Sequence, residues 1–410
     1  MYTTNKERMT EKIKTFSNFG DLGNGGITRL SLSPEALKAR AEFKKRVAEL
    51  GMEIETDDLG SIYATLPGSD PGLKRIVMGS HMDSVRSGGN YDGIYGVLSS
   101  LEAVETIVKE NIPHRHPLTV MVWTNEEGAR FEPAMMCSGI VLGKFEKEKM
   151  LAVVERDGTK TFGEALAESG WAGDEKNRLN PEKYVCYFEP HIEQGPVLEE
   201  EGIEIGVVEG VVGMVNYDII LEGVSSHAGT TPQSYRKDAL KAAAWTIMEL
   251  WDKLGKLDSK LVFTTGQIQC KPNVHTIVPN YVKFTLDSRH QDMDVLAQVV
   301  DIIENLPKDV FGCKLSYEEH WGRKTIQFND KMIGFINDSV KELGYTNKPM
   351  YSGAGHDAQY VAEMIPAVMI FIPSKGGLSH TVVEYSSPEQ TWQGANVLLN
   401  AIIEADAKMD

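Results

Sequence analysis

The sequence predicts an α/β protein in which a larger α/β domain with a mixed sheet is interrupted by a smaller α+β domain. Apolar runs of strand length alternate with stretches of helical periodicity near both ends of the chain, which is typical of βαβ units. The middle of the chain changes to the order β-α-β-β-α-β of a ferredoxin-like domain. A chain of 410 residues also exceeds what one hydrophobic core usually serves, so its length suggests two or three domains.

The first part of the larger domain, residues 1–209, contains a helix with clear caps. Ser33 suits the N-cap, Pro34 suits the first helical position, and Gly51 follows the last turn. Further on, a stretch of helical spacing lies between two apolar runs, which gives the order strand, helix, strand. The elements expected here are the helix Ser33–Gly51, the strands Ile62–Leu66 and Arg75–Met78, the helix Gly93–Glu110 and the strand Leu118–Trp123.

The inserted domain is expected over residues 210–327, and the larger domain resumes over residues 328–410. In this last part, Lys331–Leu343 has helical spacing and Ala367–Ile372 is an apolar run of strand length. The elements expected in the insertion are strands at Val215–Leu221, Leu261–Ile268, Tyr281–Leu286 and Lys314–Glu318, with helices near Lys237–Leu254 and Val295–Leu306.

Composition limits the partners and the compartment. The net charge of −17 argues against nucleic acid or an anionic membrane as a partner, because both are bound through a basic face. The sequence has no run of about 18 apolar residues, so no membrane span is expected, and its first residues lack the apolar stretch of a secretory signal. Scattered cysteines without a CxxC pair are typical of the reducing cytoplasm, where we expect the protein. They are Cys137, Cys186, Cys270 and Cys313.

Histidines and carboxylates recur close to the predicted strands and to one predicted helix. Because functional groups of α/β sheets collect at the carboxyl ends of strands, we expect these side chains to converge. Imidazole and carboxylate are the ligands that suit zinc, manganese, cobalt or nickel. The candidate residues are His81, Asp92, Glu126, Glu127, His191 and His380.

Asp92 and the adjacent glutamates suit a site with two metal ions. Two ions about 3.5–4 Å apart need a bridging group, and a carboxylate has two oxygens for that purpose. Adjacent glutamates at the end of a strand can face one centre, where one binds metal and the other handles protons. Taken singly, each candidate also fits a structural role, such as a helix cap or a solvated charge. Their shared ligand chemistry and shared position favour a metal hydrolase.

Seven segments of the chain resemble the hydantoinase/carbamoylase amidases, a branch of the superfamily of dinuclear-zinc aminoacylases and carboxypeptidases. They follow the family's order from about residue 25 to the end, and several are long and specific. The segments are GSHMDSVRSGGNYDGIYGVL, TNEEGARFEPAMMCSG, HIEQGPVLE, SSHAGTTP, DSRH, SGAGHDAQ and MIFIPSKGGLSH.

The resemblance implies a complete dinuclear site. His81 and His191 would each hold one ion, and Asp92 would bridge the two. Glu127 and His380 would complete the ligand shells. The implied cofactor is two divalent metal ions per subunit, with zinc as the first expectation and manganese, cobalt or nickel as alternatives.

The resemblance also implies residues that serve the chemistry. Glu126 would be the general base, and Asp83 would orient the ring of His81 through its second nitrogen. His227, from the inserted domain, would polarise the scissile carbonyl. In this family that histidine often serves the neighbouring subunit, so the resemblance implies a homodimer and gives the inserted domain the roles of lid and dimerisation domain.

The implied substrate contacts lie in both domains. Arg289 would grip a substrate carboxylate in a bidentate pair, Gln194 would contact the carbamoyl end, and Gly355 would line the pocket. One position departs from the family, which usually has Asn where this chain has Thr276 in NVHTIVPN. A threonine offers one short hydroxyl in place of an amide that both donates and accepts.

The implied reaction is hydrolysis of the carbamoyl or ureido C–N bond of an N-carbamoyl-L-amino acid or a related ureido acid such as allantoate, with release of ammonia and carbon dioxide. The segment EEGARFEPAMMCSG resembles the N-carbamoyl-L-amino-acid amidases, whereas SHAGTTP, SRH and SGAGHDAQ are closer to allantoate amidohydrolases. An aminoacylase or dipeptidase is an alternative, because the superfamily shares its metal core. A second alternative, a non-catalytic protein that binds a small ligand, predicts a broken ligand set or a missing base, and this chain has every one of those residues.

Overall fold

The computed structural model describes residues 1–409, which form two compact units. The first unit comprises Met1–Gly210 together with the segment that begins at Gln327, and the second comprises Val211–Ile326. Each unit has its own sheet and its own hydrophobic core.

The first unit is built around a mixed sheet, as the sequence predicts. Four neighbouring strands in its centre run parallel, whereas the strands on either side of them pair antiparallel. Because the four parallel strands all end at one edge, the residues that follow them come together there. In spatial order, the strands described within residues 1–409 are β1 (Glu53–Thr56), β2 (Ile62–Leu66), β4 (Leu118–Trp123), β3 (Arg75–His81), β5 (Tyr184–Ile192), β15 (Ala367–Ile372), β6 (Ile205–Val211) and β13 (Ile326–Gln327), and β14 (Asn347–Ser352) also pairs with β6.

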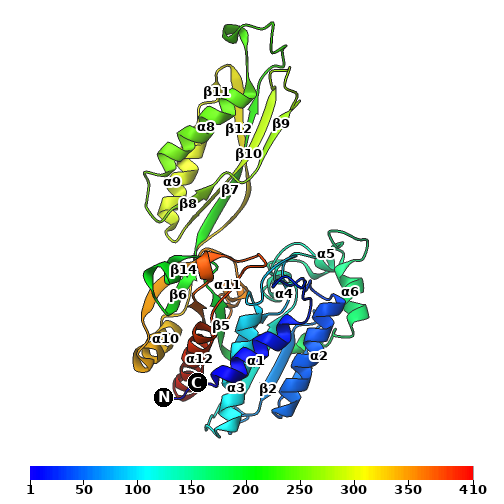
Figure 1. Ribbon diagram of the computed structural model, residues 1–410, viewed down its shortest axis with the longest axis vertical. Helices are drawn as coiled ribbons and strands as arrows, with labels where there is room; N and C mark the ends of the chain where they lie inside the picture. The colour runs from blue at the N-terminus through cyan, green and yellow to red at the C-terminus, as the bar shows by residue number, and fades with distance from the viewer. Residues whose placement is uncertain (410) are drawn as a thin grey trace. The chain divides into compact units, whose positions relative to one another are not determined.

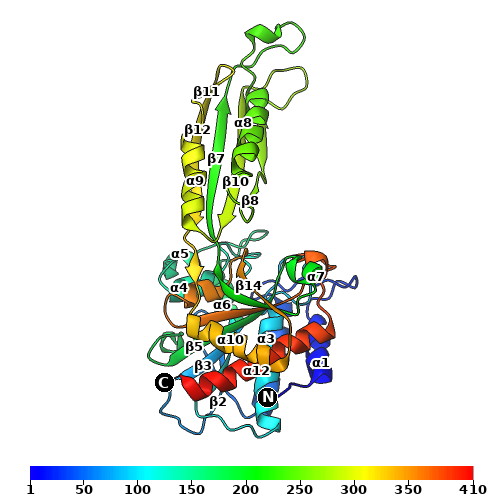
Figure 2. The same ribbon diagram turned by 90° about the vertical axis from the view of Figure 1, so that its left-hand side faces the viewer.

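Helices cover this sheet and share its main core (Figures 1 and 2). The longest ones are α1 (Lys6–Ser17), α2 (Pro34–Glu49), α3 (Ile94–Lys109), α10 (Asp330–Leu343) and α12 (Pro388–Lys408). The helix α12 packs against α3 and α10, and α3 packs on β3. A smaller separate core involves α4 (Met136–Val141) and α6 (Phe162–Ser169). The remaining short helices are α5 (Lys147–Leu151), α7 (Val197–Glu201) and α11 (Asp357–Val361), with single turns at Glu175–Asn177 and Lys375–Gly377.

The second unit is an antiparallel sheet with two helices that share one core with it. Its strands, in spatial order, are β11 (Asp309–Val310), β12 (Cys313–Arg323), β7 (Gly213–Glu222), β10 (Tyr281–His290) and β8 (Val262–Thr264), and β9 (Ile268–Lys271) also pairs with β10. The helices are α8 (Ala239–Leu254) and α9 (Met293–Glu304). Along β10, buried side chains alternate with half-buried ones, so one face of the sheet carries the core.

One predicted strand of the second unit is wrong in detail. The run Leu261–Ile268 was expected to be one strand, but β8 ends at Thr264 and β9 begins at Ile268. The pairing register against β10 shifts by one residue between these two strands. A bulge with Gly266 in the intervening segment explains the break, because an extra residue interrupts the ladder of backbone hydrogen bonds.

The lengths and apolar character of the helices also bear on membranes. Within the described part of the chain, residues 1–409, no helix is both long enough and apolar enough to cross a bilayer.

Candidate metal centre

Two groups of ligand atoms in the first unit share one residue, Asp92. His81, Asp92 and His191 form the first group, and Asp92, Glu127 and His380 form the second. Within each group the ligand atoms lie within 4.8 Å of one another. His81 and His191 share the first group, so the expectation that each of them holds a different ion does not fit this grouping. His81 ends β3, His191 lies at the end of β5, and the other ligands follow β4 and β15 or precede α3. The four parallel strands therefore bring these side chains to one edge of the sheet.

The two carboxylate oxygens of Asp92 face different histidines. Oδ1 lies 3.2 Å from Nε2 of His191 and 3.7 Å from Nε2 of His81. Oδ2 lies 3.2 Å from Nε2 of His380, and this nitrogen lies 3.4 Å from Oε2 of Glu127. This is the arrangement that a carboxylate bridging two ions requires.

Backbone carbonyls fix the rings of the two buried histidines. Nδ1 of His81 lies 3.0 Å from the carbonyl oxygen of Asp83, and Nδ1 of His191 lies 2.9 Å from that of Ile192. A carbonyl only accepts, so each Nδ1 carries the hydrogen and each Nε2 keeps a lone pair that faces Asp92. Both rings therefore present the nitrogen and the tautomer that a metal ligand needs.

The side chain of Asp83 acts differently from the sequence expectation. The carboxylate of Asp83 lies 3.8 Å from Nδ1 of His81, whereas the carbonyl oxygen of Asp83 lies 3.0 Å from the same nitrogen. The carboxylate instead accepts the backbone N–H groups of Glu126 (3.4 Å) and Glu127 (3.2 Å). In the structure Asp83 therefore orients His81 through the backbone and holds the glutamate turn through the side chain.

The two adjacent glutamates reach the same centre because the chain turns after β4. Asn125 has a left-handed backbone (φ 57°), which breaks the strand alternation that would point the glutamates apart. Oε2 of Glu126 lies 3.4 Å from Nε2 of His81, while Glu127 faces His380. Gly93 makes room for the site, since a Cβ there would lie 2.2 Å from Cε1 of His81.

The electrostatics of the site favour a bound cation. Burial raises the pKa of Glu126 well above its ordinary value, and repulsion from Asp357 and Glu127 adds to the shift. Burial, followed by repulsion from Asp92, raises the pKa of Glu127 in the same way. Among residues 1–409, Oε1 of Glu127 is buried without a hydrogen-bond partner. A divalent ion would satisfy this oxygen and offset the crowded negative charge, so these residues fit a metal centre.

Sequence reasoning missed two residues that support Asp92. Oε1 of Glu384 accepts the backbone N–H groups of Tyr91 (2.9 Å) and Asp92 (3.1 Å). The hydroxyl of Ser379 lies 3.0 Å from Oδ2 of Asp92 and 2.9 Å from Oε2 of Glu384. Ser379 could have been found as the neighbour of His380. Glu384 carries no sequence signal, because its partner lies 292 residues away.

Of the predicted substrate contacts, Gln194 and the loop of Gly355 lie in the first unit with the ligands. Nε2 of Gln194 donates to Oδ2 of Asp92 at 2.7 Å. The residue after Gly355, His356, packs its ring edge against the ring of His191, with the centroids 4.5 Å apart. The structure therefore brings Gln194 to Asp92 and the residue next to Gly355 to the ring of His191.

The other predicted contacts belong to the second unit. His227 pairs with Ile277, and the backbone N–H of Ala228 donates to the carbonyl of Thr276 at 2.8 Å, so the segments of His227 and Thr276 adjoin. The guanidinium of Arg289 is paired with Asp287, two residues earlier on β10, through Nε at 2.8 Å from Oδ1.

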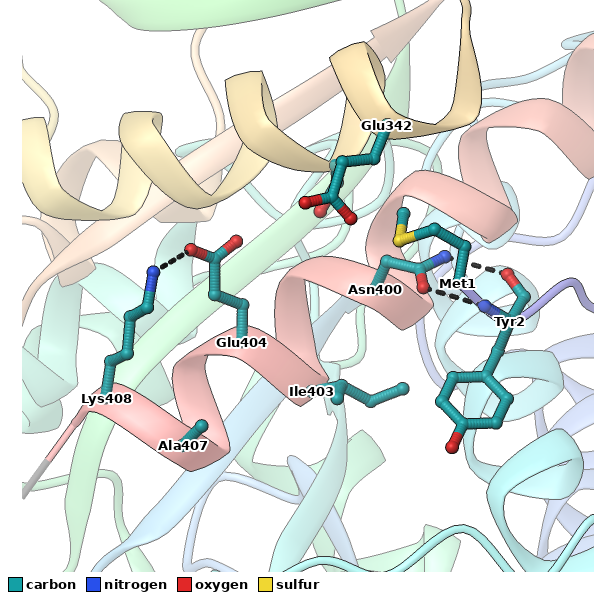
Figure 3. A pocket seen from close by; sticks show the side chains of 9 residues that line it. Met1, Tyr2, Glu342, Asn400, Ile403, Glu404, Ala407 and Lys408 are labelled. Carbon is teal, nitrogen blue, oxygen red and sulfur yellow. Dashed lines mark hydrogen bonds and ion pairs between the residues drawn. The ribbon is translucent and has the colours of Figure 1, made fainter.

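A surface pocket of about 320 Å³ lies elsewhere in the first unit, between α10, α12 and the N-terminal residues (Figure 3). In it the backbone of Tyr2 exchanges hydrogen bonds with the side chain of Asn400 (Figure 3). Its lining includes none of the residues predicted for the site. We therefore take the Asp92-centred group as the candidate functional site.

An α/β sheet that gathers histidines and carboxylates at the ends of its parallel strands, with an additional buried glutamate beside them, defines a metal-dependent hydrolase. The chain belongs to the peptidase family M20/M25/M40, whose model matches residues 77–404.

Similarity to individual proteins covers nearly the whole chain. The chain is 36% identical to an N-carbamoyl-L-amino-acid amidohydrolase from Rhizobium meliloti, over 98% of this chain and 96% of that protein. It is 32% identical to an allantoate amidohydrolase from Bacillus subtilis (strain 168), over 97% of each. A crystal structure of an amidase of the hydantoinase/carbamoylase family from Burkholderia multivorans has a TM-score of 0.91 and 35% identity, over 99% of each chain. The resemblance that the motifs indicate is confirmed, and the protein is an amidohydrolase.

Proposed function

We propose that this protein hydrolyses the carbamoyl or ureido C–N bond of N-carbamoyl-L-amino acids, or of a related ureido acid such as allantoate. The carbamate that is released breaks down to ammonia and carbon dioxide. The observation that carries the proposal is the pair of ligand groups centred on Asp92 with Glu126 beside them. It lies in a chain that is similar along its full length to proteins named for these two reactions.

The proposed ligands hold two divalent ions. His81 and His191 would hold one ion together with Oδ1 of Asp92, and Glu127 and His380 would hold the other together with Oδ2 of Asp92. Zinc is the proposed metal, and manganese, cobalt or nickel would suit the same oxygen and nitrogen ligands. When bound, such ions polarise a carbonyl and make water a better nucleophile at neutral pH.

The proposed general base is Glu126. It takes a proton from the attacking water, holds it on the carboxylate and returns it to the leaving nitrogen. Burial and the neighbouring carboxylate of Asp357, which raise the pKa of Glu126, support this role because they make the group a better proton acceptor. The carboxylate of Asp83 positions Glu126 by accepting a hydrogen bond from the backbone N–H of Glu126.

The proposed substrate contacts come from both units. Gln194 contacts the carbamoyl end, which is supported by the bond from Gln194 to Asp92, and Gly355 lines the pocket. His227 polarises the scissile carbonyl, Thr276 lies beside it, and Arg289 binds the substrate carboxylate. The pairing of Arg289 with Asp287 holds the guanidinium in place until a substrate carboxylate arrives.

The unit at residues 210–327 is proposed to be a ferredoxin-like lid and dimerisation domain, and residues 1–209 with 328–410 the catalytic domain. The order β12, β7, β10, β8 with two helices in one core supports the ferredoxin-like assignment. Closing of such a lid would position the substrate and exclude water. The proposed location is the cytoplasm, and four free thiols support a reducing compartment.

The proposed homodimer is supported by an apolar face of α8. Large apolar side chains at helical spacing are exposed there, with Met248 68% exposed. Such a face is a typical contact surface between two copies of a chain. The other exposed residues are Leu240, Trp245 and Trp251.

Light scattering tests the dimer. We expect twice the monomer mass for the wild type and the monomer mass for the pair of changes Met248→Glu and Trp251→Glu. The matched control is Val154→Glu, an exposed apolar position of the first unit, which should leave the mass unchanged. A monomeric wild type would contradict the proposal.

Ammonia release by the metal-loaded enzyme tests the reaction. N-carbamoyl-L-amino acids and allantoate are compared with N-acyl amino acids and dipeptides, for which free amine is measured. Turnover of either ureido substrate supports the proposal and shows whether the enzyme acts on N-carbamoyl-L-amino acids or on allantoate. Amine release with silence on both ureido substrates would make the protein an aminoacylase or dipeptidase. Silence on all substrates with metal bound would indicate a non-catalytic ligand-binding protein.

A further inference from the structure

The loop that carries His227 determines which ring nitrogen bears the hydrogen. Nδ1 of His227 lies 3.0 Å from the backbone nitrogen of Gly229 and 3.2 Å from that of Thr230. A backbone N–H only donates, so Nδ1 must accept from both groups. The hydrogen of the neutral ring therefore sits on Nε2, which is left to face outward as a donor.

The loop is held from both sides. The guanidinium of Arg236 donates to the carbonyls of Ala228 (2.6 Å) and Thr231 (2.9 Å). On the other side, the backbone N–H of Ala228 donates to Thr276, and the N–H of Val278 donates to Ser226 at 2.8 Å. These contacts keep the two N–H groups aimed at the ring.

The same surroundings leave no place for a hydrogen on Nδ1 of His227. Protonation of Nδ1 would place its hydrogen against those of Gly229 and Thr230 and would break both hydrogen bonds. The segment that pairs with this loop carries one further histidine, His275.

We infer that His227 works as a neutral hydrogen-bond donor through Nε2, and that the backbone of Gly229 and Thr230 positions it in this form. The inference rests on the proposed function, in which His227 faces the scissile carbonyl. In this role His227 donates a hydrogen bond to the developing oxyanion and transfers no proton, so Glu126 carries the proton alone. A neutral donor stays a donor as the pH rises, whereas an imidazolium would lose its charge above a pH of about 6.5.

Nitrogen NMR of the full-length protein labelled with ¹⁵N-histidine tests the inference without substrate. The signals of His227 are assigned by their loss in His227→Gln. We expect the ¹⁵N shifts of an Nε2–H tautomer at pH 7.5. An Nδ1–H tautomer, or an imidazolium at pH 7.5, would overturn the inference.

Two variants of one residue test the role of the backbone. Thr230→Pro removes one N–H donor, whereas Thr230→Ala keeps it and serves as the matched control. We expect the ratio of the Nδ1–H to the Nε2–H tautomer of His227 to rise about tenfold in Thr230→Pro, which corresponds to the loss of one hydrogen bond, and to stay unchanged in Thr230→Ala. Equal tautomer ratios in the two variants would overturn the positioning role.

The NMR experiment tests the tautomer of His227 and the activity assay tests the proposed function, so each can be rejected without the other. An Nε2–H ring in a protein that cleaves no ureido substrate would reject the proposed function and leave the assigned tautomer standing. Ureido hydrolysis by a protein whose His227 carries its hydrogen on Nδ1 would reject this inference alone.

Discussion

The ring of His81 is held by the backbone of Asp83, whose carbonyl oxygen lies 3.0 Å from Nδ1, while the carboxylate lies 3.8 Å away. That carboxylate is left to accept the backbone N–H groups of Glu126 and Glu127. One residue thus sets the tautomer of a metal ligand with its main chain and shapes the turn of the proposed base with its side chain.

This division of roles predicts that Asp83→Asn keeps both metal ions. An amide offers one acceptor, but its NH₂ group faces the second backbone N–H, so the turn of Glu126 is disturbed. We expect kcat to fall about tenfold, which corresponds to about 1.4 kcal/mol. Metal content by mass spectrometry, measured beside kcat, checks this. Loss of an ion would show that the carboxylate orients His81 after all.

The same substitution by glutamine should have different effects on metal content at the two adjacent glutamates. In Glu126→Gln the amide cannot take a proton, so turnover should fall by about 10³-fold while the metal content stays unchanged. In Glu127→Gln the ligand to the second ion is weakened, so metal content should fall as well. Each variant is the control for the other. Metal loss in Glu126→Gln would make that residue a ligand instead of the base.

Metal affinity should rise with pH. Burial and neighbouring carboxylates raise the pKa of Glu126 and Glu127, and the hydrogen bond to Asp92 raises that of His380. The metal-free protein therefore holds these protons more tightly than free carboxyl and imidazole groups do, so a metal ion competes with protons and its affinity falls as the pH falls. We expect about a tenfold change per pH unit for each displaced proton.

Calorimetry of metal binding in two buffers with different ionisation enthalpies measures the protons released by the metal-free protein. Metal binding should release protons, and the number released should fall as the pH rises. Binding that is independent of pH, with no proton release, would contradict the raised pKa values.

Gly93 should tolerate no side chain. A Cβ at this position would lie 2.2 Å from the ring of His81, and its backbone has φ 65°. We expect Gly93→Ala to lower the affinity for metal more than 10-fold by displacing the ligand. The matched control is Gly202→Ala, where φ is 64° and nothing lies within 4 Å of the added Cβ.

The control carries the backbone strain of a left-handed alanine, about 1 kcal/mol, without the clash. It should unfold at slightly lower denaturant concentration and bind metal as the wild type does. Equal metal affinity in the two variants would show that Gly93 is needed for its backbone alone.

The sequence by itself determined the class of fold and the types of ligand. The strands Leu118–Trp123 and Ala367–Ile372 have the bounds that their apolar runs predict, because a buried parallel strand is apolar on both faces. The candidate ligands were recognisable because they follow such strands and match a known set of motifs. Sequence reasoning did not assign β5, although it carries His191, because its nine buried residues include a proline and a glutamate.

Only the tertiary structure decided how the centre is supported. The carbonyl of Asp83, the carboxylate of Glu384 and the turn at Asn125 act through backbone geometry, which side-chain patterns do not encode. Glu384 reaches the N–H of Asp92 across 292 residues of sequence. Such a contact forms because burial of the whole sheet brings the two loops together and leaves the N–H groups there in need of an acceptor.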